Sequence, residues 1–102
     1  MKKFIYICSP YRGNIERNTE KARDHCREVM KEGHIPVAPH IYFTQFLDDD
    51  DPDERTMGIQ TGLDILKACD EVWVYDVGLM SEGMKEEIRY AIEHNIVMRI
   101  KN

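Results

Sequence analysis

Apolar residues follow two alternating patterns along the chain: short continuous runs, and longer stretches in which they recur every three or four positions. Continuous runs at residues 4–8, 72–75 and 96–100 predict strands, and the first two are apolar enough to lie inside a sheet. A further run at 34–40 contains Pro36 and Pro39, which suit the edge or the end of a strand, because proline cannot donate to the ladder. The pattern therefore predicts four strands.

Helical periodicity fills most of the sequence between these runs. The first predicted helix starts after Asn14, a suitable N-cap, and ends at Gly33, with apolar positions at Ile15, Ala22, Cys26, Val29 and Met30. The second runs from residue 53 or 54 to 68, and the third opens at Ser81 and stops near residues 94–95. Residues 41–47 fit either a helical turn or a loop, and residues 48–54 predict an acidic loop.

Strands and helices thus alternate in the order β-α-β-loop-α-β-α-β. This order predicts an α/β fold with a mostly parallel sheet of four or five strands between two helical layers, a Rossmann-like or flavodoxin-like three-layer sandwich. Because the chain has 102 residues and contains no linker or internal repeat, we expect a single domain over residues 1–102.

Composition and charge narrow the classes of function. The formal net charge of −5 argues against a nucleic-acid polymer as partner, and no apolar run approaches the length of a membrane span. The chain has an odd number of cysteines, and they lie far apart in the sequence: Cys8, Cys26 and Cys69. This pattern indicates reduced thiols in a cytoplasmic protein. We also expect a homo-oligomer, since a domain of this size gains buried core by pairing.

Two loops that follow predicted strands combine small residues, hydroxyl groups and a helix start. Residues 8–14 include Ser9, Arg12 and Gly13, and residues 76–83 include Ser81 and Gly83. At the carboxyl ends of parallel strands, free backbone N–H groups and a helix N-terminus hold anions. The two loops together predict an anion or phosphate site. Each serine alone is more simply explained as a cap, and Arg12 alone as part of a surface ion pair.

Glu87 lies on the apolar side of the third predicted helix, beside Met84, Ile88 and Ala91 at helical spacing. Because burying an unpaired carboxylate is costly, this position has two explanations. Either Glu87 is a nucleophile or base next to the anion site, or it flanks the apolar stripe and pairs with a lysine or arginine. Taken alone, the position favours the second explanation.

Three further residues are candidates for the same site. Tyr6 lies inside the first strand, where the default explanation is core packing with the hydroxyl bonded to a partner. Asp64 lies on the second helix, and Asp76 ends the strand at 72–75, at the functional edge of the sheet. Converging carboxylates there would permit acid–base chemistry, although a lone aspartate at a strand end is more often a turn residue.

The sequence contains no metal-binding or cofactor-binding motif. The aspartates at 48–51 lack the spaced oxygen ligands and central glycine of a calcium loop, and His34 and His40 have no zinc spacing. There is no glycine-rich dinucleotide motif and no Walker motif. We therefore expect neither a metal nor a cofactor, and we interpret residues 48–54 as a solvated surface loop or a lid.

Three stretches in register resemble the nucleoside 2-deoxyribosyltransferase superfamily and its branch of 2′-deoxynucleoside 5′-phosphate N-hydrolases. The first two are Ile5-Tyr6-Ile7-Cys8-Ser9-Pro10-Tyr11-Arg12-Gly13 and Leu63-Asp64-Ile65-Leu66-Lys67-Ala68-Cys69-Asp70. The third is the pattern Ser81-x-Gly83-x-x-x-Glu87-x-x-Tyr90-Ala91. Their order and approximate spacing match the superfamily over nearly the whole chain.

The resemblance implies a role for each matched residue. Glu87 would attack C1′ of a deoxyribose and would be oriented by Tyr6. Asp64 would contact the sugar or the base, and Asp76 would protonate the leaving base. A 5′-phosphate would be held by Ser9, Arg12, Gly13, Ser81 and Gly83. The implied function is cleavage or transfer of the N-glycosidic bond of a deoxynucleoside or its 5′-monophosphate.

One departure from the family pattern supports an alternative. Glu87 is followed by Ile88-Arg89 where the family has Leu-Gly, and Arg89 is able to pair with an acid. The alternative is a non-catalytic nucleotide-binding or sensing domain of the same fold. Its partner would still be a small-molecule nucleoside or nucleotide.

Overall fold

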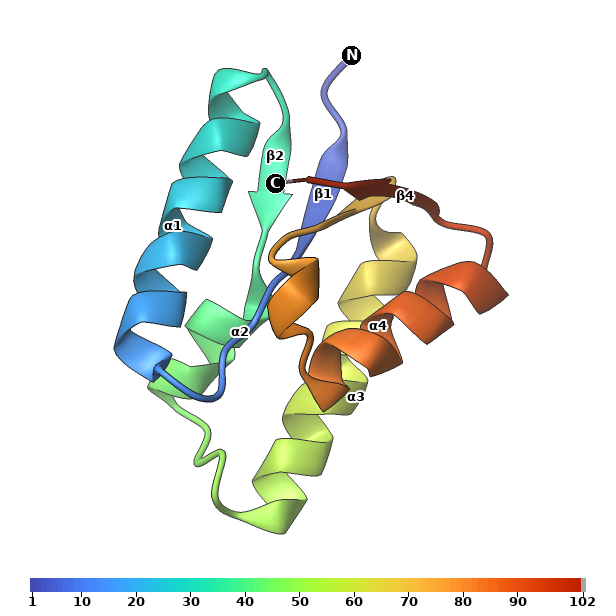
Figure 1. The fold of residues 1–102 in the computed structure, drawn as a ribbon. Helices are drawn as coiled ribbons and strands as arrows, with labels where there is room; N and C mark the ends of the chain where they lie inside the picture. Colours follow the sequence, from blue (N-terminus) through green and yellow to red (C-terminus); the bar gives the residue numbers. More distant parts are fainter. Residues whose placement is uncertain (102) are drawn as a thin grey trace.

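A computed structural model describes residues 1–101, so Asn102, the last residue of the predicted domain, lies outside the described residues. Over that range the chain forms a four-stranded parallel sheet in the order β2-β1-β3-β4, with helices on both faces (Figure 1). The elements are β1 (Phe4–Cys8), α1 (Ile15–Lys31), β2 (Ile35–Val37), α2 (Pro39–Tyr42), η1 (Phe43–Gln45), α3 (Pro52–Ala68), β3 (Glu71–Val74), η2 (Val77–Leu79), α4 (Glu82–Glu93) and β4 (Val97–Ile100). The predicted three-layer α/β fold is confirmed.

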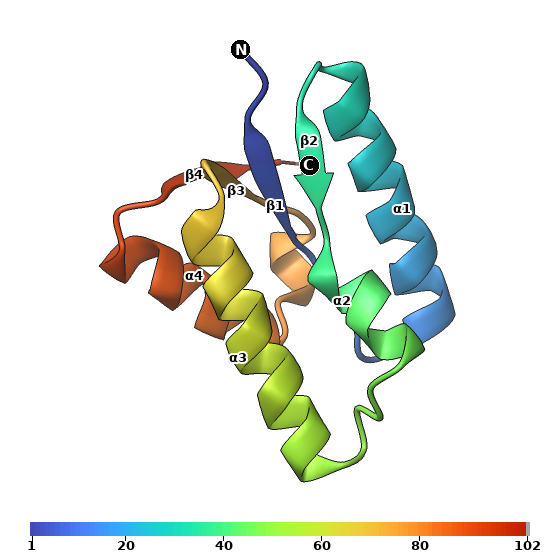
Figure 2. The ribbon, with the colours of Figure 1, turned by 180° about the vertical axis from the view of Figure 1, so that it is seen from behind.

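The two faces of the sheet bury separate hydrophobic clusters. On one face, α1 packs through Val29 against a cluster that contains Ile5, Ile7, Trp73 and Tyr75. On the other face, α3 and α4 pack together against a cluster that contains Tyr6, Cys8, Leu63, Leu66, Val72, Val74, Met84 and Ala91 (Figure 2). Side chains alternate along a strand, so neighbouring residues of β1 and β3 enter opposite clusters.

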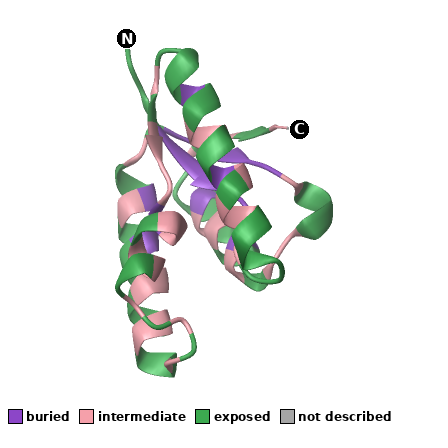
Figure 3. Cartoon of the chain, turned by 90° about the vertical axis from the view of Figure 1, so that its left-hand side faces the viewer, coloured by how far each residue is buried: buried purple, intermediate pink, exposed green. Residues whose placement is uncertain are grey.

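Burial is concentrated in the two central strands, as Figure 3 shows. All of β3 and all of β1 except Phe4 are buried, which confirms the prediction that these two apolar runs lie inside the sheet. The edge strands β2 and β4 contain no fully buried residue. Within residues 1–101, no helix combines the length and the apolarity needed to cross a bilayer.

The starts of the three long helices α1, α3 and α4 carry side-chain caps. The Asn14 side chain accepts a hydrogen bond from the backbone N–H of Arg17, as the sequence predicts for an N-cap. Helix α3 begins at Pro52, one or two residues earlier than predicted, because Asp51 caps it and accepts bonds from two free backbone N–H groups. The end of the acidic run is therefore a helix cap.

The segment after β2 differs from the prediction. Strand β2 is shorter than the predicted run at 34–40, because Pro39 is the first residue of the short helix α2 instead of the end of a strand. Proline suits this position, since its missing N–H is not needed there and its φ is preset for a helix. The chain continues through α2 into η1, so residues 41–45 form helical turns.

Strand β1 marks the topological switch point of the sheet. It pairs with β2 on one side and with β3 on the other. The chain leaves β1 for β2 through α1 on one face, and it reaches β3 through α3 on the opposite face. Ligands of open parallel sheets bind where such connections diverge, outside the carboxyl ends of the strands. This edge is where the predicted loops lie.

Candidate active site

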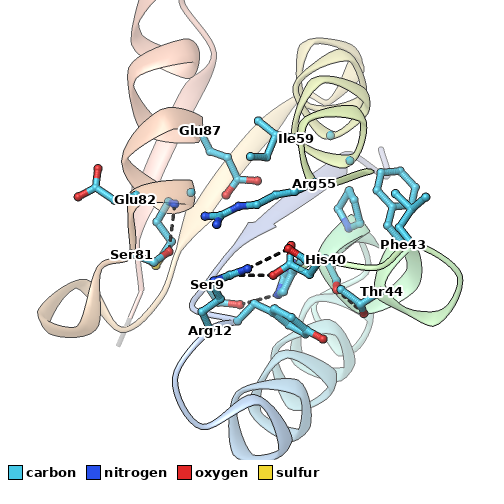
Figure 4. A pocket seen from close by; sticks show the side chains of 18 of the residues that line it. Ser9, Arg12, His40, Phe43, Thr44, Arg55, Ile59, Ser81, Glu82 and Glu87 are labelled. Carbon is cyan, nitrogen blue, oxygen red and sulfur yellow. Dashed lines mark hydrogen bonds and ion pairs between the residues drawn. The ribbon is translucent and has the colours of Figure 1, made fainter. Parts of the chain in front are cut away.

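A cavity of about 380 Å³ opens at the carboxyl edge of the sheet, on the face that α3 and α4 cover. Segments that follow three different strands line it: Ser9 lies after β1, His40 after β2 and Ser81 after β3. Helix α3 forms another wall, and α4 contributes Glu87, whose side chain points into the cavity (Figure 4). The volume is typical of a small-molecule site.

Glu87 is a half-buried carboxylate in this cavity. The buried hydroxyl of Tyr6 donates a hydrogen bond to Glu87 Oε2. Burial raises the pKa of Glu87 from 4.5 to about 7, although the hydrogen bonds from Tyr6 and Cys8 oppose the rise. Arg89 turns outward instead and pairs with Glu86 at 3.8 Å. The replacement of the family's Leu-Gly by Ile88-Arg89, which supported a non-catalytic domain, therefore places no arginine in the cavity.

Tyr6 is held as a hydrogen-bond donor. Burial, followed by the nearby charge of Glu87, raises the pKa of the Tyr6 phenol well above its usual value, so the hydroxyl keeps its proton. Gly62 of α3 lies against this hydroxyl, because a Cβ at that position would stand 3.3 Å from the Tyr6 oxygen. The absence of a side chain at Gly62 therefore leaves room for the Tyr6–Glu87 contact.

Ser9 and His40 form a second polar pair. The Ser9 Oγ lies 3.1 Å from His40 Nε2, although 31 residues separate them in the sequence. Burial lowers the pKa of His40 to about 4, and the charge of His25 contributes further. The imidazole is therefore neutral near pH 7. Sequence reasoning did not select His40, because its only sequence signal is its place after a Pro-rich strand.

Arg12 reaches across to the acidic loop. Its Nε donates to Asp49 Oδ2 at 2.8 Å, and its terminal NH2 group donates to the Asp49 carbonyl oxygen at 2.9 Å. Asp50 adds a longer contact of 3.9 Å. Arg12 and Asp49 both line the cavity, so their contact forms part of its wall. This pairing joins residues that lie 37 positions apart.

The start of α4 is placed as the sequence predicts. Ser81 Oγ accepts a hydrogen bond from the backbone N–H of Met84 at 3.2 Å, and Ser81 and Gly83 both line the cavity. Gly13 lies outside it. Its φ of +100° is the left-handed conformation that glycine tolerates, and it borders a neighbouring shallow hollow beside the acidic loop.

The remaining lining residues come largely from the segment between β2 and the middle of α3. Phe43, Leu47 and Ile59 supply apolar surface, and the guanidinium of Arg55 extends into the cavity (Figure 4). Arg55 was not among the residues predicted for the site. It lies in the first turns of a helix, where a charged residue is ordinarily a solvated one.

Asp64 and Asp76 are not brought to the cavity. Asp64 is exposed on α3, since its neighbours Leu63 and Leu66 occupy the inward face. Asp76 has a left-handed backbone, and its carboxylate points to α1, 3.6 Å from Lys21 and 3.8 Å from His25. The predicted convergence of these carboxylates with Glu87 is therefore not observed.

The described residues contain no ready-made metal centre. Within residues 1–101, no group of three His, Cys, Asp or Glu side chains lies close enough to hold a metal ion. The aspartates of the acidic run are instead bound to Arg12, to backbone N–H groups and to the start of α3.

The fold is that of the 2-deoxyribosyltransferases. The 2-deoxyribosyltransferase of the psychrotolerant bacterium Bacillus psychrosaccharolyticus matches 95% of this chain with a TM-score of 0.76 and 15% sequence identity. The 2-desoxiribosyltransferase from Leishmania mexicana matches 96% of it with a TM-score of 0.65 and 19% identity. This chain spans 70% of the first enzyme and 63% of the second. Identities this low establish the shared fold alone.

The chain belongs to a family described as a domain of unknown function, DUF7768, whose family model matches residues 3–101. No curated protein matches the sequence. The structural similarity to the two 2-deoxyribosyltransferases confirms the predicted resemblance to their superfamily, at the level of the fold.

Proposed function

We propose that this protein cleaves or transfers the N-glycosidic bond of a deoxynucleoside or deoxynucleoside 5′-monophosphate, with Glu87 as the nucleophile. The observation that carries the proposal is the Glu87 carboxylate, which points into the cavity and accepts a hydrogen bond from Tyr6. The fold shared with two enzymes named as 2-deoxyribosyltransferases supports it.

The reaction consists of two displacements at C1′ of the sugar. In the first, a carboxylate oxygen of Glu87 forms a bond to C1′ while the bond from C1′ to the base nitrogen breaks. The base leaves with the bonding electron pair and takes a proton from water. In the second, water or another base attacks C1′, loses a proton, and releases the Glu87 carboxylate, so the configuration is retained.

The surroundings of Glu87 suit a nucleophile that works near neutral pH. The ionised carboxylate is a far better nucleophile than the protonated acid, and a pKa of about 7 leaves about half of it ionised at pH 7. Partial burial removes water from the carboxylate and so increases its reactivity. The hydroxyl of Tyr6 fixes the position of one oxygen, which leaves the other for attack.

The apolar and polar walls suit the two parts of a nucleoside. Phe43, Leu47 and Ile59 provide surface against which a base can pack. Ser9 and His40 provide neutral hydrogen-bonding groups. Arg55 supplies a donor for the carbonyl oxygens of a base, where it would stabilise the negative charge of the leaving group. Asp64 and Asp76 have no part in this mechanism, since neither lines the cavity.

The test is a chromatographic assay for released free base. The purified protein is incubated with the four deoxynucleosides and their 5′-monophosphates, each with and without an acceptor base. Base release or exchange is expected from the natural protein. Because Glu87 supplies the attacking oxygen, Glu87→Ala is expected to reduce the rate at least about a thousandfold.

The matched control is Glu86→Ala, which removes an exposed carboxylate from the preceding position of the same helix. Its activity is expected to stay within about twofold of the natural protein. Full activity of a folded Glu87→Ala variant would contradict the mechanism. Binding of nucleosides without any turnover would instead identify a non-catalytic nucleoside-binding domain.

A further inference from the structure

We infer that the cavity selects the uncharged nucleoside over its 5′-monophosphate, and that Asp49 determines this specificity by occupying Arg12. The inference rests on the proposed function and names its substrate class. It concerns the groups at the mouth of the cavity that a 5′-substituent would meet. The sequence alone assigns these same groups to a phosphate.

The first observation is that two N–H groups of the Arg12 guanidinium already donate hydrogen bonds within the protein. A phosphate would use the parallel N–H groups of a guanidinium, and here Nε and a terminal NH2 group are bonded to Asp49 at 2.8 Å and 2.9 Å. The loop that carries Asp49 is itself anchored. The backbone N–H of Asp48 donates to Glu54 at 2.7 Å, and that of Asp50 donates to Asp48 Oδ1 at 2.9 Å.

The second observation is that the two candidate serines and the histidine beside Ser9 bring no positive charge to a phosphate. Ser81 Oγ serves as the cap of α4, where it accepts from Met84. Ser9 Oγ is bonded to His40, whose low pKa leaves the imidazole neutral near pH 7. A phosphate would find no positive charge at this histidine, and each serine hydroxyl could offer it one neutral donor at most.

The third observation is the balance of charge around the cavity. The lining contains two guanidinium groups, of Arg12 and Arg55, against four acidic side chains, of Asp49, Glu54, Glu82 and Glu87. A monophosphate would bring up to two further negative charges into this surrounding, and like charges repel strongly where water is partly excluded. A nucleoside brings none.

Asp49 also offers a nucleoside something that a phosphate cannot use. A carboxylate accepts several hydrogen bonds, and Arg12 Nε occupies only one oxygen of Asp49. The 5′-hydroxyl of a nucleoside can donate to this carboxylate while the pair with Arg12 stays intact. A phosphate, which is an acceptor, has no proton to donate there near pH 7 and would have to displace Asp49 from Arg12.

Arg55 is the rival phosphate ligand, because its guanidinium also reaches into the cavity (Figure 4). Its place on α3, across from the loop after β1, suits the base end of the substrate under the proposed function. The variant Arg55→Gln is therefore expected to lower kcat/KM for a nucleoside and its monophosphate by similar factors. A loss confined to the monophosphate would overturn the inference.

The decisive experiment compares each deoxynucleoside with its own 5′-monophosphate, first by kcat/KM and then by Kd from calorimetry. For the natural protein, kcat/KM is expected to be at least about tenfold higher for the nucleoside, the factor that corresponds to one displaced charge pair. In Asp49→Asn, kcat/KM for the monophosphate is expected to rise about tenfold, because a neutral amide holds the Arg12 guanidinium less strongly than a carboxylate does and a phosphate can displace it.

The matched control is Asp53→Asn, which removes the same charge from the adjoining start of α3 without a contact to Arg12. It is expected to change the ratio of the two substrates less than about twofold. A natural protein that prefers the monophosphate, or an Asp49→Asn ratio that stays unchanged, overturns the inference while leaving the glycosidic reaction in place.

Calorimetry separates this failure from failure of the proposed function. If neither substrate turns over, the proposed reaction is wrong, and the Kd ratio then decides the ligand class. Tighter binding of the nucleoside by about tenfold supports the inference, and equal or tighter binding of the monophosphate overturns it. If Asp49→Asn does not fold, the ratio of the two Kd values measured on the natural protein decides whether the cavity prefers the nucleoside.

Discussion

Replacing Glu87 with glutamine is expected to stabilise the folded protein while it abolishes the reaction. Glutamine has nearly the same shape as glutamate, and its amide oxygen can still accept the hydrogen bond from Tyr6. It carries no charge, so it avoids the burial that raises the pKa of Glu87 to about 7. Its neutral amide oxygen is also too weak a nucleophile to attack C1′.

The magnitude follows from the two pKa values. A carboxyl with a pKa of 4.5 in the unfolded chain and about 7 in the folded protein binds its proton more tightly when folded. The free energy of unfolding is then unaffected below pH 4.5, falls as pH rises from 4.5 to 7, and stays lower above pH 7. The difference between the two values corresponds to at most about 3 kcal/mol. Glutamine escapes this loss, so the variant gains about 2–3 kcal/mol above pH 7.

Urea denaturation measures this difference directly. Unfolding curves of the natural protein and of Glu87→Gln are recorded between pH 4 and pH 8, and the difference in their unfolding free energies is plotted against pH. The difference is expected to be small at pH 4 and to reach its full value at pH 8. The control Glu86→Gln changes an exposed carboxylate on the same helix and should give a small, flat difference.

Two outcomes of the urea experiment would contradict the raised pKa of Glu87. A difference that does not change with pH would show that the two states bind the Glu87 proton equally well. A variant less stable than the natural protein at pH 8 would show that the charge itself contributes favourable contacts. Either result would remove the raised pKa as an argument for a nucleophile at this position.

Three further predictions follow from neighbouring contacts. Tyr6→Phe removes the donor that lowers the pKa of Glu87, so the rise of kcat/KM with pH is expected to move to higher pH, and activity at pH 7 to fall about tenfold. Gly62→Ala places a methyl group 3.3 Å from the Tyr6 oxygen and should shift the pH profile in the same direction, with no further shift when combined with Tyr6→Phe. Hydrogen bonds lower the pKa of Glu71 from 4.5 to about 2, and they come from Trp73, Lys3 and Arg99. The contribution of the Glu71 carboxylate to the free energy of unfolding is present above pH 4.5 and lost as pH falls toward 2. The melting temperature of Glu71→Gln should therefore drop less between pH 5 and pH 3 than that of the natural protein.

The fold could be predicted from the sequence because its signals are local. Continuous apolar runs predicted the strands, and three-to-four-residue spacing predicted the helices, with Asn14 and Ser81 marking two of the starts. The strand prediction was wrong at 38–40, where Pro39 starts a helix. Proline serves the end of a strand and the first turn of a helix equally well, so local sequence does not separate the two.

The candidate site could be predicted only in part, because its contacts join distant segments. Glu87, Tyr6, Ser9 and Arg12 were selected and do line the cavity. The partners that determine their state lie on other elements, as for His40 with Ser9 and Asp49 with Arg12. Local sequence also gave no sign that the backbone at Asp76 is left-handed, which turns its carboxylate toward α1.

The cost of Glu87 to folding is itself an argument about function. A domain of this size has a total stability of about 5–15 kcal/mol, so a loss of up to about 3 kcal/mol above pH 7 is a large fraction of it. A carboxylate at this position contributes nothing to packing that a glutamine would not. The cavity, the donor Tyr6 and the space left by Gly62 all keep the carboxylate accessible on one side only. Such an arrangement is expected where the charged form is needed for chemistry, and a purely structural role would not require it.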